Sequence, residues 1–175
     1  MLETYKLFNR NIFTDDRGSL SETFKKSEFE KNLKIKINFV QDNFVESKKN
    51  VLRGLHYQVA PKTQGKYISV LEGEIFDVII DIRKDSNFYG KWYGFNLSSS
   101  NGNSLWVPRG FAHGFLTLSE KSLVLYKLTD SYSKINDRSI RWDSKKLAIN
   151  WPTSSEIFLS EKDKLAKEFD ENIFL

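Results

Sequence analysis

The chain has 175 residues, a net charge of +4 and no cysteine. This length is enough to bury a real core, and we expect one domain over residues 1–175. Without cysteine, disulfides and thiol chemistry are excluded. The positive charge is spread along the chain and forms no basic block, which fits a small anionic ligand and indicates no nucleic-acid partner.

The N-terminal sequence lacks the apolar core of a signal peptide. No apolar run approaches the length of a membrane span. We therefore expect a cytoplasmic protein with no membrane partner.

The first quarter of the chain alternates short strand patterns with turn signals. Residues 1–13 and 20–24 each predict a short strand, and an Asp-Asp-Arg-Gly turn separates them. Residues 27–33 predict a short helix, with Ser27 as its N-cap. Residues 37–44 predict another strand.

The clearest β pattern follows a polar loop. Residues 67–71 predict a strand, Gly73 lies in a tight turn, and residues 75–83 predict the next strand. Its side chains divide by alternation into Phe76, Val78, Ile80 and Ile82 on one face and Asp77, Ile79 and Asp81 on the other. A barrel strand whose polar face lines a cavity has this pattern. Carboxylates that face solvent are the usual interpretation for a sheet, and this segment alone supports that interpretation at least as well.

The second half continues with short strands. Residues 92–97 and 122–129 predict strands, whereas residues 133–150 are polar and irregular. Residues 160–169 predict a short charged helix with Ser160 as its N-cap. Many short strands with few, short helices indicate an all-β sandwich or barrel.

The chain has two histidines, and both lie beside glycines at the ends of β patterns. His56 belongs to the segment Val51–Lys66, which also holds Arg53. His113 lies in a second glycine-containing segment. A single histidine is by default a packed or surface residue, but glycine neighbours allow backbone or ligand to approach closely. These segments are therefore candidate parts of a site, and the signal is stronger for His56.

Other chemistries find little support. A metal site usually needs three or four His, Glu, Asp or Cys ligands, and the two histidines form no H-x-H pair. We therefore predict no metal. The chain has no G-x-G-x-x-G, no P-loop and no G-x-S-x-G motif.

Several polar residues have an ordinary structural interpretation beside a functional one. Arg17 and Arg53 could bind phosphate oxygens in pairs or form surface salt bridges. Asp163, third after Ser160, could stabilise the start of a helix. Tyr126 alternates with apolar residues and would by default be core. The residues alone leave these alternatives open.

Taken together, the motifs occur in one order over nearly the whole chain. They include D-x-R-G-x-x-x-E at Asp15–Glu22, Q-x-N at Gln41–Asn43, V-L-R-G-L-H-Y-Q at Val51–Gln58, Q-x-K at Gln64–Lys66, G-x-x-x-D-V at Gly73–Val78, P-x-G-F-A-H-G-F at Pro108–Phe115, Y-K-x-T-D-x-Y at Tyr126–Tyr132 and L-S-x-K-D at Leu159–Asp163. In this order and spacing the chain resembles the dTDP-4-dehydrorhamnose 3,5-epimerases, the RmlC-like branch of the cupin superfamily.

The resemblance implies a cupin-type antiparallel β-barrel, or jelly roll, with a few short helices. It implies a homodimer with an exchanged N-terminal strand, and an isomerase of carbohydrate biosynthesis that uses neither metal nor cofactor. The implied substrate is a 4-keto-6-deoxy sugar linked to a nucleoside diphosphate.

Site roles follow position by position from the same resemblance. It implies His56 as the general base, Asp163 as its carboxylate partner, Tyr126 as the general acid and Lys66 as the cation beside the C4 oxygen. The positions implied to hold sugar, diphosphate or base are Arg17, Glu22, Gln41, Asn43, Arg53, His113 and Tyr132.

These residue types suit the reaction. The hydrogens at C3 and C5 of a 4-keto sugar are acidic because both carbons adjoin the carbonyl. A base removes one of them, a fixed positive charge stabilises the enolate, and an acid on the other face returns a proton. No cofactor is needed, because the keto group is the electron sink.

Two departures from the family pattern leave alternatives. Ser19, Leu20 and Ser21 stand where relatives often carry base-binding aromatic residues, and Ser133 stands where a proline is usual. The nucleotide is therefore either dTDP or GDP, and GDP is the one used by relatives that act on deoxyheptoses. The inverted carbon is C3, C5 or both. An inactive cupin nucleotide-sugar-binding module and a metal-dependent cupin oxygenase are the competing classes.

Overall fold

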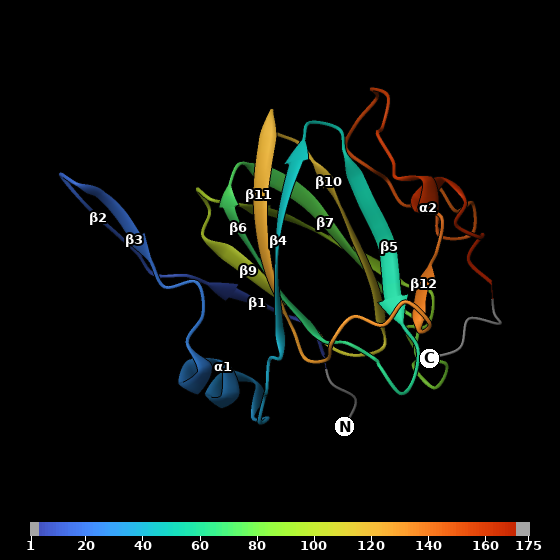
Figure 1. Cartoon of the computed structure of the whole chain (residues 1–175), viewed down its shortest axis with the longest axis horizontal. Helices are drawn as coiled ribbons and strands as arrows, with labels where there is room; N and C mark the ends of the chain where they lie inside the picture. The colour runs from blue at the N-terminus through green and yellow to red at the C-terminus, as the bar shows by residue number, and fades with distance from the viewer. Residues whose placement is uncertain (1–3, 171–175) are drawn as a thin grey trace.

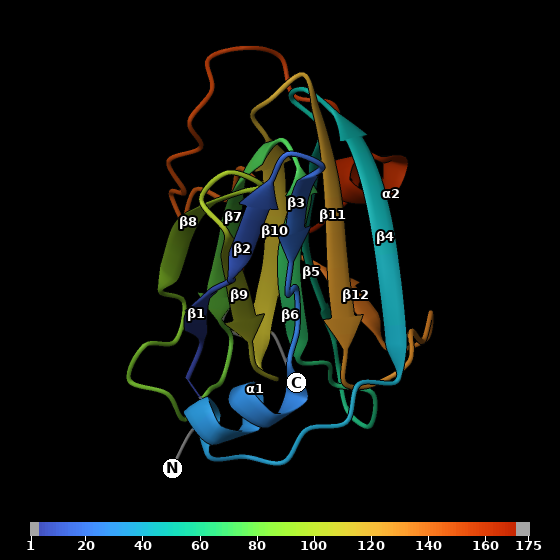
Figure 2. The ribbon, with the colours of Figure 1, turned by 90° about the vertical axis from the view of Figure 1, so that its left-hand side faces the viewer.

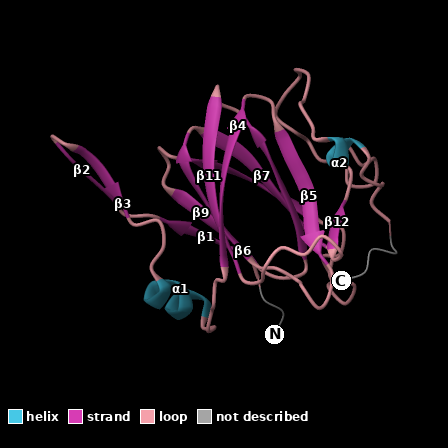
Figure 3. Ribbon diagram, viewed as in Figure 1, coloured by secondary structure: helices cyan, strands magenta, loops and turns pink. Residues whose placement is uncertain are grey.

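Two antiparallel five-stranded sheets face each other and form a barrel (Figures 1 and 3). The structure is a computed structural model that describes residues 4–170. The first sheet has the order β1 (Lys6–Asn9), β9 (Asn103–Val107), β6 (Lys66–Glu72), β11 (Lys121–Leu128) and β4 (Gln41–Lys48). The second sheet has the order β12 (Asp137–Ser139), β5 (Leu52–Gln58), β10 (Phe111–Thr117), β7 (Glu74–Asp81) and β8 (Trp92–Ser98). The predicted all-β fold is confirmed.

Strand β7 is buried on both faces, which decides between the two interpretations of its sequence. Val78 and Ile80 pack on the outer side of the second sheet, beneath the C-terminal segment. Ile79 packs in the cluster between the two sheets. Asp77 and Asp81 are both buried, so the solvent-facing alternative is wrong. A charged group is retained in such a place only when partners compensate its desolvation.

Helix α1 (Lys26–Leu33) lies below the end of the first sheet and closes a separate aromatic cluster (Figure 2). Phe29 from the helix packs against Tyr67 and Trp106. The predicted N-cap is wrong, because the cap position is Lys25 and no side chain caps the helix. Burial of Phe29, rather than a favourable cap, therefore holds this helix in place.

Helix α2 (Glu161–Lys164) is shorter than the predicted helix over residues 160–169. Its predicted N-cap is confirmed, because Ser160 Oγ accepts a hydrogen bond from the Asp163 backbone at 3.2 Å. Beyond the helix, Lys167 forms a β-bridge with Ile140, and Phe169 enters the core. These long-range contacts stop the helix where local sequence would continue it.

A hairpin of β2 (Ile12–Asp15) and β3 (Gly18–Ser21) projects from the two sheets (Figure 1). The predicted strand over residues 1–13 is therefore divided between β1 and β2, and residues 1–3 lie outside the described residues. Phe13 and Leu20 on the hairpin are 56% and 62% exposed. No helix within residues 4–170 has the length and hydropathy to cross a membrane.

Candidate active site

An irregularity between β5 and β10 places two of the predicted site residues on one face of the second sheet. His113 lies opposite His56, and Phe115 lies opposite Arg53. Between these pairs β10 has one residue and β5 has two, so β5 carries a bulge. In a regular strand, residues three apart point to opposite faces. The bulge is therefore what brings both Arg53 and His56 to the same cavity.

Two glycines allow the strands to approach at this bulge. Gly54 has a φ of +140°, and a Cβ there would lie 2.5 Å from Gly114 Cα. A Cβ on Gly114 would lie 2.7 Å from the Arg53 carbonyl oxygen. Any other residue would force the strands apart. This close approach explains why glycines flank both histidine motifs.

A cavity of about 420 Å³ opens between the two sheets. Its polar lining comes from both sheets and from the C-terminal segment: Arg53, His56, Lys66, His113, Tyr126, Ser160 and Asp163. A second cavity of about 450 Å³ shares His56, Lys66 and Tyr126 with it and extends to Gln41, Asn43, Tyr132, Asp137 and Lys162. The first and second cavities therefore meet at the three shared side chains, which are three of the four predicted catalytic residues.

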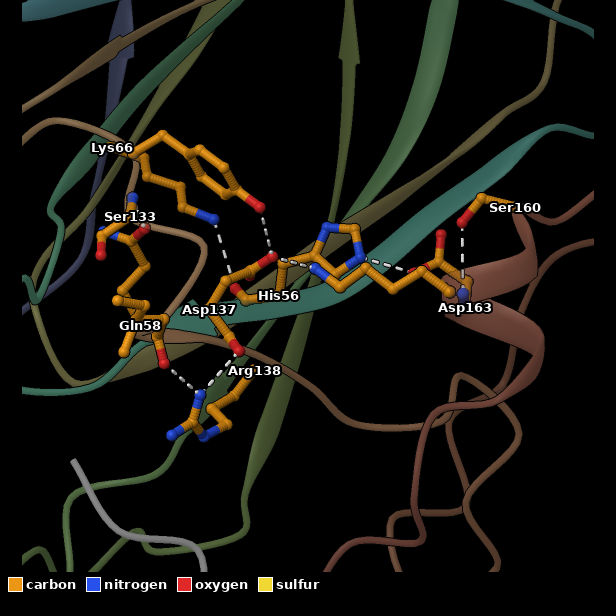
Figure 4. A network of polar contacts seen from close by, with 11 residues as sticks. His56, Gln58, Lys66, Ser133, Asp137, Arg138, Ser160 and Asp163 are labelled. Atoms are coloured by element: carbon orange, nitrogen blue, oxygen red, sulfur yellow. Dashed lines mark hydrogen bonds and ion pairs between the residues drawn. The ribbon is translucent and has the colours of Figure 1, made fainter.

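His56 lies between Lys66 and Asp163 (Figure 4). Its Nε2 is 2.5 Å from Asp163 Oδ1. Asp163 is buried, which opposes its ionisation, but hydrogen bonds from His56, Ser160 and the Gly54 backbone outweigh this and lower the pKa of the carboxyl. A buried carboxylate at this distance orients the imidazole and stabilises its positively charged form. The geometry suits a general base with a carboxylate that positions it.

Lys66 is buried at the junction of the two cavities. Its Nζ donates a hydrogen bond to the His56 carbonyl oxygen at 3.2 Å. Burial lowers the pKa of Lys66 to about 8, while the negative charges of Asp77 and Asp137 oppose that fall. The ammonium is therefore mostly charged at neutral pH, and it can stabilise a developing oxyanion in a poorly hydrated site.

Tyr126 reaches the cavities from the opposing sheet. It lies on β11, between Asn43 of β4 and Ile68 of β6 in register, and it lines both cavities. Its hydroxyl makes no hydrogen bond to any other described residue. A phenol on the first sheet thus faces an imidazole on the second, with the cavity between them. This arrangement suits proton removal and return on opposite faces of a bound molecule.

His113 forms a second histidine–carboxylate pair. Its Nε2 lies 2.8 Å from Asp77 Oδ2, and both side chains are buried. Burial lowers the pKa of His113, even though Asp77 acts in the opposite direction. The imidazole is therefore neutral at pH 7, and its Nε2–H donates to the carboxylate.

The predicted binding residues divide into two groups. Gln41 Nε2 donates to Asn43 Oδ1 at 2.8 Å, and the Tyr132 backbone donates to Gln41 Oε1 at 2.9 Å. Tyr132 also donates its hydroxyl to Asp137 at 3.1 Å. Arg53 is held by Ser47 at 2.9 Å and lines the first cavity. The structure therefore gathers these four predicted residues around the two cavities.

Arg17 and Glu22 are not brought to the cavities within one chain. Arg17 lies in the turn of the projecting hairpin, and its guanidinium pairs with Asp15 at 2.6 Å. Its side chain is 89% exposed. Glu22 follows the hairpin and accepts a hydrogen bond from Asn11 at 3.3 Å. In this chain, Arg17 has the surface salt bridge that its ordinary structural interpretation predicts.

Sequence analysis missed three charged residues at the site. Asp77 was assigned only to a strand face, although it binds His113. Asp137 lies on β12, in the segment expected to be irregular, and it pairs with Lys162 of α2. β12 is only three residues long and exists because it pairs with β5, so no pattern in the local sequence predicts it. No three His, Cys, Asp or Glu side chains gather into a metal-binding group in the described part of the chain.

Comparison with known proteins gives the family. The sequence model described as dTDP-4-dehydrorhamnose 3,5-epimerase matches residues 1–171. The chain belongs to the dTDP-4-dehydrorhamnose 3,5-epimerase family. It is 48% identical over 160 residues to the Salmonella typhimurium enzyme of that name, covering 91% of this chain and 87% of the relative. The Shigella flexneri enzyme is 46% identical over 163 residues, covering 93% of this chain and 90% of the relative.

Solved structures of the family agree with the fold. The dTDP-6-deoxy-D-glucose-3,5-epimerase of Legionella pneumophila was crystallised with dTDP-4-keto-L-rhamnose. It is 46% identical, has a TM-score of 0.90 and covers 94% of this chain and 87% of its own. The predicted family and its cupin-type barrel are thereby confirmed. Epimerases are isomerases, so the predicted enzyme class is confirmed as well.

Proposed function

We propose that this family member is a 3,5-epimerase of a dTDP-linked 4-keto-6-deoxy sugar. One observation carries the proposal: His56, paired with Asp163, and Tyr126 project from opposing sheets into connected cavities, with Lys66 at their junction. The complete set of base, cation and acid favours an enzyme over an inactive binding module.

The reaction is a proton abstraction followed by return of a proton. His56 takes the hydrogen from C3 or C5 as a proton, and the electron pair left on carbon moves to the C4 oxygen. Asp163 stabilises the imidazolium that results, and Lys66 stabilises the enolate oxygen. Tyr126 then donates a proton to the carbon from the opposite face, which inverts it. The substrate carbonyl accepts the electron pair throughout, so the reaction requires no cofactor.

The nucleotide and diphosphate occupy the part of the site lined by amide, guanidinium and phenol groups. Gln41, Asn43 and Tyr132 surround the second cavity, and Arg53 lies on the first. A guanidinium matches the geometry of phosphate oxygens. The dTDP-sugar bound by the Legionella relative supports dTDP rather than GDP as the nucleotide here.

The working enzyme is a homodimer in which each hairpin completes the site of the other copy. Two features support this: Arg17 and Glu22 lie away from the cavities of their own chain, and the hairpin exposes Phe13 and Leu20. A projecting two-stranded hairpin is only marginally stable by itself and gains stability by packing its apolar side chains. Docked on a second copy, it would bring Arg17 to the diphosphate.

Solvent exchange tests the proposed reaction directly. The protein is incubated in D2O with dTDP- and GDP-linked 4-keto-6-deoxy sugars in parallel. We expect deuterium at C3 and C5 and inverted product with the dTDP sugar. Exchange with the GDP sugar alone would contradict the nucleotide assignment. No exchange with either sugar, despite binding, would favour the inactive module.

A further inference from the structure

The surroundings of the Lys66 ammonium are poor in compensating contacts. Lys66 is 8% exposed, and its Nζ makes one hydrogen bond within residues 4–170, to the neutral carbonyl of His56. An ammonium has three donors, and burying it without compensation is costly. A stable charged state therefore needs a negative charge nearby.

Two carboxylates and one ammonium act on the charge of Lys66: Asp77 on β7, Asp137 on β12 and Lys162 on α2. The other titratable side chains that line the two cavities are Arg53, His56, Tyr57, His113, Tyr126, Tyr132 and Asp163. The Asp163 carboxylate is already paired with His56. Lys162 is a like charge and opposes the ammonium. The negative charge that Lys66 needs must therefore come from one of the carboxylates.

The two carboxylates differ in how far other groups satisfy them. Asp137 is bound by the Lys162 ammonium and by the Tyr132 hydroxyl. Asp77 accepts one hydrogen bond, from His113 at 2.8 Å, and its buried Oδ1 has no partner among the described residues. His113 is neutral, as argued above, so Asp77 has no direct cationic partner among the described residues, whereas Asp137 has one.

We propose that Asp77 is the counterion that keeps the Lys66 ammonium charged, and that it thereby sets the alkaline limit of the reaction. No ion pair directly joins these two described residues, so the effect acts through space, where the buried setting weakens screening. Asp77 acts through Lys66 and is a positioning residue. Only the catalytic consequence rests on the proposed function; the charge coupling does not.

Asp77→Asn isolates the charge, because the amide oxygen can still accept the His113 hydrogen bond. The Lys66 titration is followed in the full-length protein by competitive amine labelling against pH with mass spectrometry. Wild type should give half-maximal labelling near pH 8. Asp77→Asn should shift that midpoint down by about one pH unit or more. An unchanged midpoint would overturn the proposal.

Asp81→Asn is the matched control on the same strand. Asp81 is also buried, but it pairs with Arg83 and Ser86. This substitution should leave the Lys66 midpoint in place, and an equal shift would show that any buried carboxylate on β7 has the effect, which would contradict the proposal.

The pH profile of solvent exchange separates a charge effect from a structural one. Asp77→Asn should shift the alkaline limb of the profile to lower pH, by the same number of pH units as the labelling midpoint. A rate lowered equally at every pH, with an unmoved limb, would indicate a merely structural role and count against Asp77. A shifted midpoint with an unaltered exchange profile would support the counterion and contradict the proposed role of Lys66.

A stability comparison covers the case in which Asp77→Asn alone does not fold. Lys66→Met leaves Asp77 buried without its counterion, so the double variant Lys66→Met/Asp77→Asn should have a higher Tm than Lys66→Met alone. Equal or lower stability of the double variant would overturn the coupling.

Discussion

His56 on β5 lies directly opposite His113 on β10, and each ring binds a carboxylate from a different part of the chain. The two pairs are not equivalent. The side chain of His56 is 31% accessible, whereas that of His113 is 6% accessible. Only His56 combines access to the cavity with a partner that stabilises its charged form. The geometry therefore favours His56 over His113 as the proposed base, and His113 is a neutral residue of the cavity wall.

Replacing the base should stop proton exchange without unfolding the protein. His56→Ala removes the proposed base, and loss of a positioned base typically lowers the rate about 10² to 10⁴-fold. Deuterium uptake from D2O measures this, and a thermal melt serves as the fold control. Exchange at the wild-type rate would show that another group is the base.

Replacing the acid should separate the two half-reactions. Tyr126→Phe keeps the ring and removes the donor, so abstraction by His56 continues while return on the opposite face is slowed about 10² to 10⁴-fold. Product stereochemistry and deuterium content are measured in the same reaction. Near-normal inversion by the folded variant would contradict the assignment, and Tyr132 would be the next candidate acid.

The Asp163 carboxylate should stabilise the fold in a defined pH range. Its pKa is lowered in the folded state, so its contribution is fully present above the ordinary value of 3.8 and is lost as pH falls through the lower folded value. Asp163→Asn should therefore reduce Tm at pH 7, and the difference from wild type should narrow toward pH 3. Exposed Asp16→Asn is the control. A difference that does not depend on pH would contradict this linkage.

The close strand approach should make Gly54 far less replaceable than another glycine with similar backbone geometry. Gly54→Ala combines a φ of +140° with the 2.5 Å contact to Gly114 Cα. Gly18 has a φ of +125° with nothing within 4 Å of its ideal Cβ, so Gly18→Ala carries only the backbone cost of about 1 to 3 kcal/mol. Chemical unfolding should show a clearly larger loss for Gly54→Ala. Equal losses would mean that crowding is unimportant.

Mixing two inactive variants tests the shared site. Arg17→Ala loses its hairpin cation and His56→Ala loses its base. If hairpins are exchanged, a mixed dimer regains one site, with His56 from one copy and Arg17 from the other. Co-refolding should then restore up to about a quarter of the wild-type rate, from statistical pairing of copies. No recovery, although mixed dimers form, would show that Arg17 acts within its own chain.

Local sequence patterns predicted the all-β fold, and the order of the motifs along the chain supplied the candidate catalytic residues. Period-two alternation and turn residues are short-range signals, which is why residues 75–83 could be assigned to a strand. The motif order named His56, Lys66, Tyr126 and Asp163, and the structure places all four on the first cavity. Helix ends were less predictable, because long-range packing overrides caps at α1 and stops α2 early.

Only the tertiary structure decided how those groups meet. Alternation would place Arg53 and His56 on opposite faces, and the bulge that unites them arises from strand pairing with β10. Asp163 does cap its helix through its backbone N–H, while its carboxylate crosses 107 positions of sequence to reach His56. Which charge compensates Lys66 depends on burial and distance, and neither is a local property of the sequence, because both are set by how the two sheets pack.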